Sequence, residues 1–566
     1  MSNIHPKRAD LKEILERFGG QRADGKHNTA FFKQLINFRV LPDGSIEKRN
    51  GWEKITDLPS NIRGASYVMD NEDSTCFLVS GQSVYLLFNE TELYRMLVTL
   101  EESTAPVRFF LYDESFYLLD GKHIYTLGSN GFEKAIGYVP LYGLGWDPIT
   151  MGEILEPINY LNTKLRVNYL NPDGLTSFYL PFYASSIDSV IVDGKKTPNY
   201  TFGTDTRTVI VRDTGREVEI AFTFQMESRQ CSALQESTLA FSDEMDNHHR
   251  LLLGGAIYSP YLFVNTPVST AQLNGTKLHY PTATALYFTA DGIITVGNTL
   301  APLTAFYRNN RHILGFTQTS IFALEPTSSP ERMEPFPIKT NLGCVTPGMD
   351  VVIDGDPLIL NEAGLFRVHL DSQYDLRCTH IPCPYPELTQ EGFAQNAIVC
   401  ENARHNEIWF RDRRDNEGTV LVYNTVREDW LLFKGIYADH FFDRIGTPGI
   451  CSGKLLGFFK EGRYSDNETE IEATLSTEML DFDYPELFKR TLRFSMVARS
   501  PNQQVMTTLE TDHRTRSLTF VGKPSTAVDF FDARAAMGRF RYLAVTVRHS
   551  TPSPFCIKRI SLYANL

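Results

Sequence analysis

The sequence has few cysteines and no long hydrophobic run. Its 566 residues include eight cysteines without a repeating spacing, which is typical of reduced thiols in a protein made in the cytosol. No stretch of 18 apolar residues occurs, so we expect no transmembrane helix and no membrane partner. The first residues lack the apolar segment of a secretory signal, so we expect no export by that route.

Positive charge is also scarce. The chain has 55 Lys and Arg against 68 Asp and Glu, a formal net charge of −13. Proteins that bind nucleic acid tightly neutralise its phosphates with a basic surface. The composition therefore argues against tight DNA binding. It is compatible with simple solubility, and with a surface past which DNA slides without sticking.

Motifs for catalysis and metal binding are missing as well. The sequence has no nucleophile elbow, no phosphate-cradling glycine loop, no zincin helix and no EF-hand spacing. Its tightest cluster, Cys378, His380 and Cys383, lacks the second short-spaced pair that a zinc site uses. We therefore expect no cofactor, no metal and no catalytic residue, and we interpret the protein as not being an enzyme. Two facing carboxylates of a glycosidase can be neither found nor excluded among so many acidic residues.

Aromatic residues, in contrast, are plentiful. They make up 12% of the chain, with 38 Phe and 26 Tyr, and aromatic residues favour β-strands. A unit of one strand, a turn rich in Asp, Asn or Gly, and a second strand recurs along the chain. The instances span residues 65–88, 108–127, 305–324, 351–370 and 406–433, with a weaker one at 449–464. This pattern indicates β-propeller blades, and a generic run of antiparallel hairpins is the alternative.

Two regions, 150–228 and 468–566, depart from this repeat. They show longer alternating strands, which are typical of β-sandwiches. The sequence therefore predicts an all-β fold: an irregular β-propeller with an inserted β-sandwich, a C-terminal β-sandwich and a short N-terminal helix. The expected units are an N-terminal helix and arm at 1–34, first propeller blades at 35–149, an inserted β-sandwich at 150–228, remaining blades at 229–467 and a C-terminal β-sandwich at 468–566.

The N-terminal segment has helical spacing. In residues 7–18, Leu11, Ile14, Leu15 and Phe18 would form one apolar stripe on a helix. A polar arm follows, so we expect these four side chains to contact a partner. Packing of the helix on its own domain is the alternative.

Several segments, in order along the chain, resemble one family. They are residues 37–55, 246–255, 286–298, 309–325, 341–368 and 540–564. They resemble structural proteins of bacteriophage tails, and the best named comparison is the tail nozzle or packaged-DNA stabilisation (tail tubular) proteins of short-tailed phages. The helical arm is a departure from that family.

The resemblance implies a virion structural protein, located in the tail and, during assembly, in the host cytoplasm. It implies a homo-oligomer in the form of a hexameric ring, a nozzle or hub that closes or guides the DNA exit channel. The implied partners are adaptor or portal-side tail proteins, tail fibres or spikes, and DNA that passes through without specific binding. The alternative function is a receptor- or glycan-binding module at the tail tip or collar.

Overall fold

The structure is a computed structural model. It describes residues 10–16, 18–19, 32–70, 73–89, 94–144, 154–224, 229–245, 248–256, 259–265, 286–296, 301–309, 312–326, 333–370, 376–524 and 529–566. The fold is all-β. The α-helices in this part of the chain are short, namely α1 (Arg229–Gln235) and α2 (Phe393–Asn396). None of the described helices is long and apolar enough to cross a membrane.

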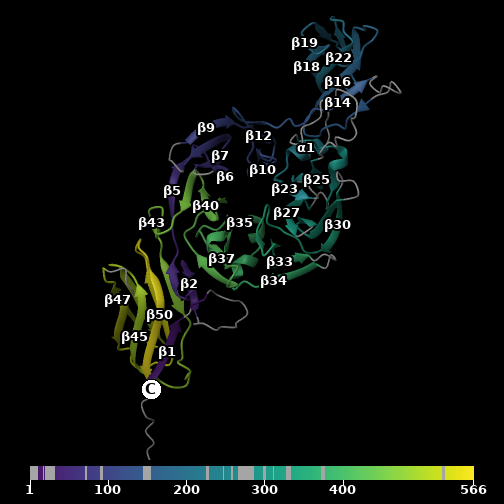
Figure 1. Ribbon diagram of the computed structural model, residues 1–566. Helices are drawn as coiled ribbons and strands as arrows, with labels where there is room; N and C mark the ends of the chain where they lie inside the picture. Colours follow the sequence, from purple (N-terminus) through teal and green to yellow (C-terminus); the bar gives the residue numbers. More distant parts are fainter. Residues whose placement is uncertain are drawn as a thin grey trace, which may run out of the picture.

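The centre of the molecule is a β-propeller (Figure 1). Its described strands form six separate four-stranded antiparallel sheets, and a seventh set of four strands belongs to a larger sheet. In ring order, the first blade is β6 (Ile62–Asp70), β7 (Asp73–Ser80), β8 (Ser83–Phe88) and β9 (Tyr94–Thr99), and the second is β10 (Arg108–Tyr112), β11 (Ser115–Leu119), β12 (Ile124–Gly128) and β13 (Gly131–Lys134). The third is β23 (Leu239–Met245), β24 (His248–Gly254), β25 (Tyr261–Val264) and β26 (Ile293–Thr295), the fourth is β27 (Leu303–Asn309), β28 (His312–Thr317), β29 (Ser320–Pro326) and β30 (Met333–Thr340), and the fifth is β31 (Val352–Ile353), β32 (Asp356–Asn361), β33 (Gly364–Leu370) and β34 (Leu376–Ile381). The sixth is β35 (Ala397–Asn402), β36 (Glu407–Asp412), β37 (Val420–Asn424) and β38 (Asp429–Phe433), and the seventh is β39 (His440–Arg444), β40 (Thr447–Ser452), β41 (Leu455–Phe459) and β5 (Trp52–Asp57).

The last blade joins the two ends of the ring. Strand β5 comes from the N-terminal part of the chain and pairs with β41, with Trp52 opposite Phe459 and Asp57 opposite Leu455. The first blade then follows directly at β6. Because one sheet contains strands from both ends of the propeller sequence, the ring cannot open without breaking that sheet.

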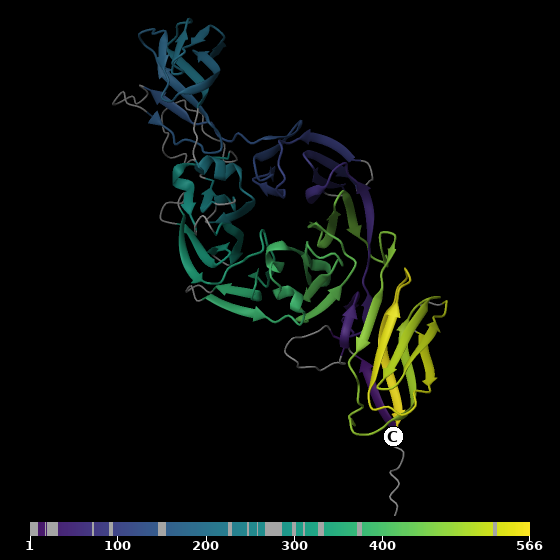
Figure 2. The ribbon, with the colours of Figure 1, turned by 180° about the vertical axis from the view of Figure 1, so that it is seen from behind.

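The inserted domain leaves the propeller between its second and third blades. Its strands are β14 (Leu141–Leu144), β15 (Ile154–Leu155), β16 (Lys164–Leu170), β17 (Ser177–Tyr179), β18 (Ala184–Val192), β19 (Lys195–Thr197), β20 (Tyr200–Phe202), β21 (Thr208–Val211) and β22 (Glu217–Phe224). A six-stranded and a three-stranded sheet enclose a separate core that includes Val167, Val209 and Phe222. This domain projects from the ring on the side away from the C-terminal domain (Figure 2).

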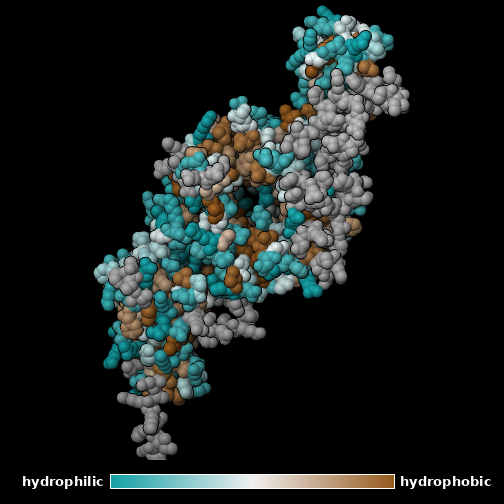
Figure 3. Space-filling view, viewed as in Figure 1, coloured by the Kyte–Doolittle hydropathy of each residue, from teal (hydrophilic) through white to brown (hydrophobic). Residues whose placement is uncertain are grey.

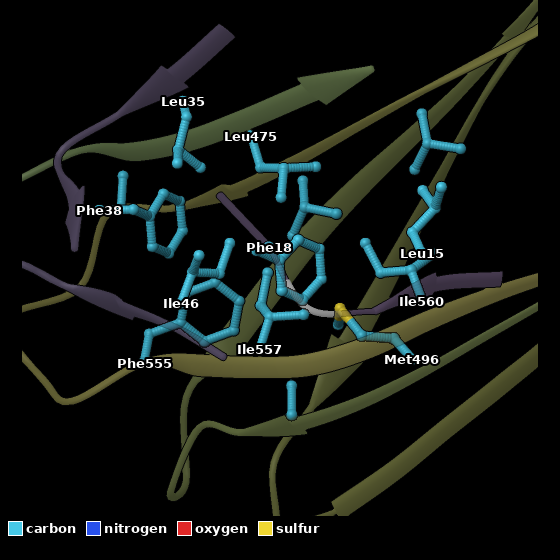
Figure 4. Close-up of a cluster of buried hydrophobic side chains, with 14 of the residues drawn as sticks. Leu15, Phe18, Leu35, Phe38, Ile46, Leu475, Met496, Phe555, Ile557 and Ile560 are labelled. Atoms are coloured by element: carbon cyan, nitrogen blue, oxygen red, sulfur yellow. The ribbon is translucent and has the colours of Figure 1, made fainter. Parts of the chain in front are cut away.

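The C-terminal domain is built from both ends of the chain. Its strands are β1 (Asp10–Glu16), β2 (Phe32–Ile36), β3 (Phe38–Val40), β4 (Ile46–Lys48), β44 (Ala473–Thr477), β45 (Arg490–Arg499), β46 (Gln504–Thr511), β47 (Thr515–Val521), β48 (Asp529–Ala535), β49 (Leu543–His549) and β50 (Cys556–Asn565), and the short hairpin β42 (Ser465–Asp466) and β43 (Thr469–Glu470) precedes them. One sheet has the order β3-β4-β50-β45-β48, with β1 also on β50. The other contains β2-β44-β49-β46-β47. Figure 4 shows side chains from both ends of the chain in the core between these sheets.

Propeller and C-terminal domain are joined through a continuous sheet. Strand β2 pairs in parallel with β38 at Ile36 and Leu432, which extends the sixth blade into the C-terminal domain. Beside this junction Gly51 crosses Ser465 so closely that a Cβ on Gly51 would overlap the carbonyl oxygen of Ser465. The two bodies therefore share backbone hydrogen bonds rather than a flexible tether.

The predicted N-terminal helix is wrong. Residues Asp10–Glu16 form strand β1, which pairs antiparallel with Arg559–Asn565 of β50. The helical spacing exists in the sequence, but tertiary pairing overrides a local preference of this size. The arm at 32–34 is likewise part of strand β2.

Two expected boundaries also need correction. The propeller does not begin at residue 35, because β3 and β4 belong to the C-terminal sheet through the pairing of β4 with β50. The inserted domain begins at Leu141 rather than at residue 150, because β14 pairs in parallel with β16. The first boundary is decided by a strand at the other end of the chain, and the second by a strand just beyond the expected boundary.

A buried histidine makes the C-terminal domain sensitive to acid. His549 is 1% exposed, and its ring stacks on Phe555 at 4.5 Å. Burial, and then the charge of Lys48, lowers the pKa of His549 to about 3. Because the folded pKa lies below the unfolded value, the stabilisation is complete above about pH 6.5 and is lost as the pH falls toward 3.

We expect the free energy of unfolding to fall by about 2 kcal/mol between pH 7 and pH 5 because of His549 alone. Urea titrations at both pH values should show a smaller loss in the variant His549→Gln. His513→Gln is the matched control, because the side chain of His513 is 62% exposed. Equal losses in the wild type and in both variants would contradict this assignment.

Candidate functional site

The axis of the propeller contains an elongated cavity. The innermost strands of neighbouring blades contact one another around it, as β6 does with β39 and β10, and β10 with β23. Two adjoining cavities of about 430 Å³ and 370 Å³ lie between these strands. They share Arg108, Gly348, Val399 and Phe441. The space-filling view shows the propeller face hollowed at this point (Figure 3).

Ionisable side chains are segregated along this cavity. Arg413 and His440 line the larger part, Asp350, Glu401 and Asp443 line the smaller part, and Arg108 lines both. The sorting follows from strand direction, because β35 and β39 each enter at the larger part and end at the smaller one. The cavity is therefore cationic toward one end and anionic toward the other.

The acidic end holds carboxylates close enough to influence one another. Burial, and then the charges of Asp443 and Asp350, raises the pKa of Glu401. At the other end, burial and the charge of Arg413 lower the pKa of His440 to about 4, so this imidazole is neutral at pH 7. A carboxyl with a raised pKa beside other carboxylates can attract cations or exchange protons with a bound molecule.

A second candidate site lies on the inserted domain. The guanidinium of Arg207 lies 4.4 Å from the ring centre of Tyr179 and 5.0 Å from that of Tyr183. Arg207 Nε donates to the carbonyl of Leu180 at 3.2 Å, and Nη2 donates to that of Pro181 at 3.0 Å. Tyr179 and Tyr183 are 58% and 62% exposed. We call Tyr179, Arg207 and Tyr183 the tyrosine platform.

The tyrosine platform is held in place before any partner arrives. The carbonyl hydrogen bonds hold the guanidinium of Arg207, and both rings contact that guanidinium, which reduces the side-chain freedom lost on binding. Exposed aromatic rings can stack on the apolar face of a sugar or insert into a protein interface. Sequence analysis did not single out these residues, because the stack joins two segments that no motif connects.

The four N-terminal residues expected to contact a partner are placed differently. Leu11, Leu15 and Phe18 are 8%, 1% and 3% exposed in the core of the C-terminal domain, while Ile14 is 38% exposed. Within one chain the three buried side chains therefore pack on their own domain, and their contact with a partner stays a prediction. The strand geometry of β1 separates Ile14 from its neighbours.

Metal ligation has no support in the described part of the chain. There, no group of three or more His, Cys, Asp or Glu side chains is placed to hold a metal ion. Cys378 and His380 lie on β34, the outermost strand of its blade.

Comparisons with known proteins give the following. No protein-family model matches the sequence, and no curated protein matches it. Among solved structures, an exo-β-1,3-galactanase from Phanerochaete chrysosporium is 6% identical, with 97% of this chain and 100% of that chain covered at a TM-score of 0.24. A Mycobacterium tuberculosis puromycin-hydrolyzing peptidase is 10% identical, with 76% and 62% covered at a TM-score of 0.26.

The expectation that the protein is not an enzyme is contradicted by this comparison. Three of the matched structures are exo-β-1,3-galactanases, with TM-scores of 0.24, 0.23 and 0.21. A likeness at this level assigns no reaction to this chain.

Proposed function

We propose that this protein is a virion structural protein of a bacteriophage tail that assembles as a hexameric ring, a nozzle or hub at the DNA exit channel. The observation that carries the proposal is the division of the chain into a propeller with a β-sandwich body at each of two opposite ends (Figure 2). Separate bodies let one subunit contact neighbours around the ring and other tail proteins along the tail axis. The ordered sequence resemblance to tail nozzle proteins is the second support.

The charge of the chain agrees with a channel that DNA passes without binding. Six copies would carry six times the formal charge of −13, which repels the DNA backbone where it faces the lumen. In this proposal the adaptor or portal-side proteins lie on one side of the ring, and tail fibres or spikes attach at the other.

We expect the purified protein to form a particle of about 390 kDa, six times the 64.3 kDa of one chain. The physical reason is that every subunit of a closed ring uses both of its contact surfaces, so no contact surface remains open to further subunits. Mass photometry at physiological salt checks this. A particle of three chains or one chain, unchanged at higher concentration, would contradict the hexamer.

A receptor- or glycan-binding role is the second candidate, and the tyrosine platform favours it. We expect the double variant Tyr179→Ala, Tyr183→Ala to lose at least about tenfold in affinity for a host surface polysaccharide, because each stacking ring contributes about 1 kcal/mol or more. The control is Tyr437→Ala, an exposed tyrosine of the propeller. Binding should be measured by glycan array followed by calorimetry, and equal affinities of both variants would remove this role.

A further inference from the structure

Strand β1 fits its place in the C-terminal domain poorly. Along a strand, alternate residues face the same side, so Glu13 lies on the side of the buried Leu11 and Leu15 and is itself half-buried. Burial, and then the charges of Asp483 and Asp481, raises the pKa of Glu13. The apolar Ile14 faces outward. Docking of β1 therefore places a carboxylate beside like charges and leaves an apolar side chain exposed.

The same segment carries a competing local preference. As a helix, it would place Leu11, Ile14, Leu15 and Phe18 on one face. A segment whose local preference disagrees with its position in the fold is held there only by tertiary contacts. For β1 these contacts include the pairing with β50 and the burial of three side chains.

The attachment of β1 limits the number of strand pairings that its departure would break. Among the described strands, β1 pairs with β50 alone, and it lies at the N-terminal end of the described chain. Thirteen residues, 19–31, separate Phe18 from Phe32. Fully extended, such a segment spans at most about 45 Å.

We propose that β1 is exchanged between copies of this chain, so that in the assembled particle β1 of one subunit docks against β50 of its neighbour. A second copy is the occupant that the structure favours, because its β50 offers the same groove that already accepts Leu11, Leu15 and Phe18. Exchange keeps every one of these contacts and places them between two subunits, which they then hold together non-covalently. The inference rests on the proposed function only in that it requires an oligomer.

Disulfide trapping tests the exchange. Lys12 of β1 and Arg493 of β45 lie on opposite sides of Tyr563 in β50 and are both paired with it in register. Chains with Lys12→Cys are mixed with chains with Tyr563→Cys, assembled and oxidised. We expect disulfide-linked dimers on non-reducing gels. The control mixture combines Arg493→Cys with Tyr563→Cys, and it should give none, because β45 remains in its own subunit.

The outcomes separate this inference from the proposed function. Mass photometry on the same samples reports whether a ring forms. A ring in which the Lys12 mixture yields no more linked dimers than the Arg493 mixture overturns strand exchange and leaves the ring intact. Equal crosslinking in both mixtures also overturns it, since random collision then explains the product. Absence of any oligomer overturns both proposals.

Glu13 provides a second test. Glu13→Gln removes the charge beside Asp481 and Asp483, so β1 should stay docked longer in its own subunit. We expect the rate of linked-dimer formation to fall by roughly threefold or more at neutral pH. Glu16→Gln, on the exposed side of the same strand, should leave the rate unchanged. Equal rates in the two variants would overturn the role given to Glu13.

Discussion

Replacing Arg49 with alanine is expected to lower the free energy of unfolding by about 3–5 kcal/mol. The side chain of Arg49 is 0% exposed and forms an ion pair with Asp466. Its Nε donates to Asn37 Oδ1 at 2.9 Å, and its guanidinium also donates to the carbonyls of Asn50 and Lys434. The variant leaves Asp466 buried without its cation, at the junction of propeller and C-terminal domain.

The matched control for Arg49 is Arg404→Ala. Arg404 pairs with Glu461 at 3.1 Å, and both side chains are more than half exposed, so this pair should contribute less than about 1 kcal/mol. Urea unfolding of both variants, followed by far-UV circular dichroism, measures the difference. Similar midpoints for Arg49→Ala and Arg404→Ala would show that the junction does not depend on this arginine.

Trp409→Ala is expected to cost about 3–5 kcal/mol as well. The indole is 0% exposed and makes edge contacts with the rings of Phe433, Phe441 and Phe459 at 5.0–6.0 Å. Its Nε1 donates to Glu407 Oε2 at 3.0 Å. The variant leaves a large cavity and also removes one of the donors to a buried carboxylate, and these two effects act in the same direction.

For the Trp409 variant, thermal unfolding with tryptophan fluorescence is a suitable measurement. Tyr437→Ala is the control, since Tyr437 is 50% exposed and its removal should change stability by less than about 0.5 kcal/mol. A melting temperature of Trp409→Ala within one or two degrees of this control would contradict the central packing role of Trp409.

The sequence was sufficient to predict the propeller because its blades are local. A hairpin joins residues that are close along the chain, so turn chemistry and strand alternation reveal it. The closure of the ring by β5 was not predictable in this way, because its partner β41 lies about four hundred residues further on. The prediction of a helix at β1 is wrong because the same apolar residues fit two patterns. Four of them have helical spacing, and two of the four, Leu11 and Leu15, also lie on one side of a strand.

The sequence could not reveal the candidate sites for the same reason. Asp350, Glu401 and Asp443 come from three different blades, so no sequence spacing brings them together. The Arg49 and Asp466 pair joins residues more than four hundred positions apart. Only the folded topology places such groups side by side.

The most direct test of the ring assembly is single-particle electron microscopy of the purified protein. Class averages should show a closed ring of six subunits around an opening wide enough for duplex DNA, with the propellers visible as separate densities. The inserted domains should project from one side of each propeller and the C-terminal domains from the other. Monomers, open filaments or a ring without a central opening would contradict the account.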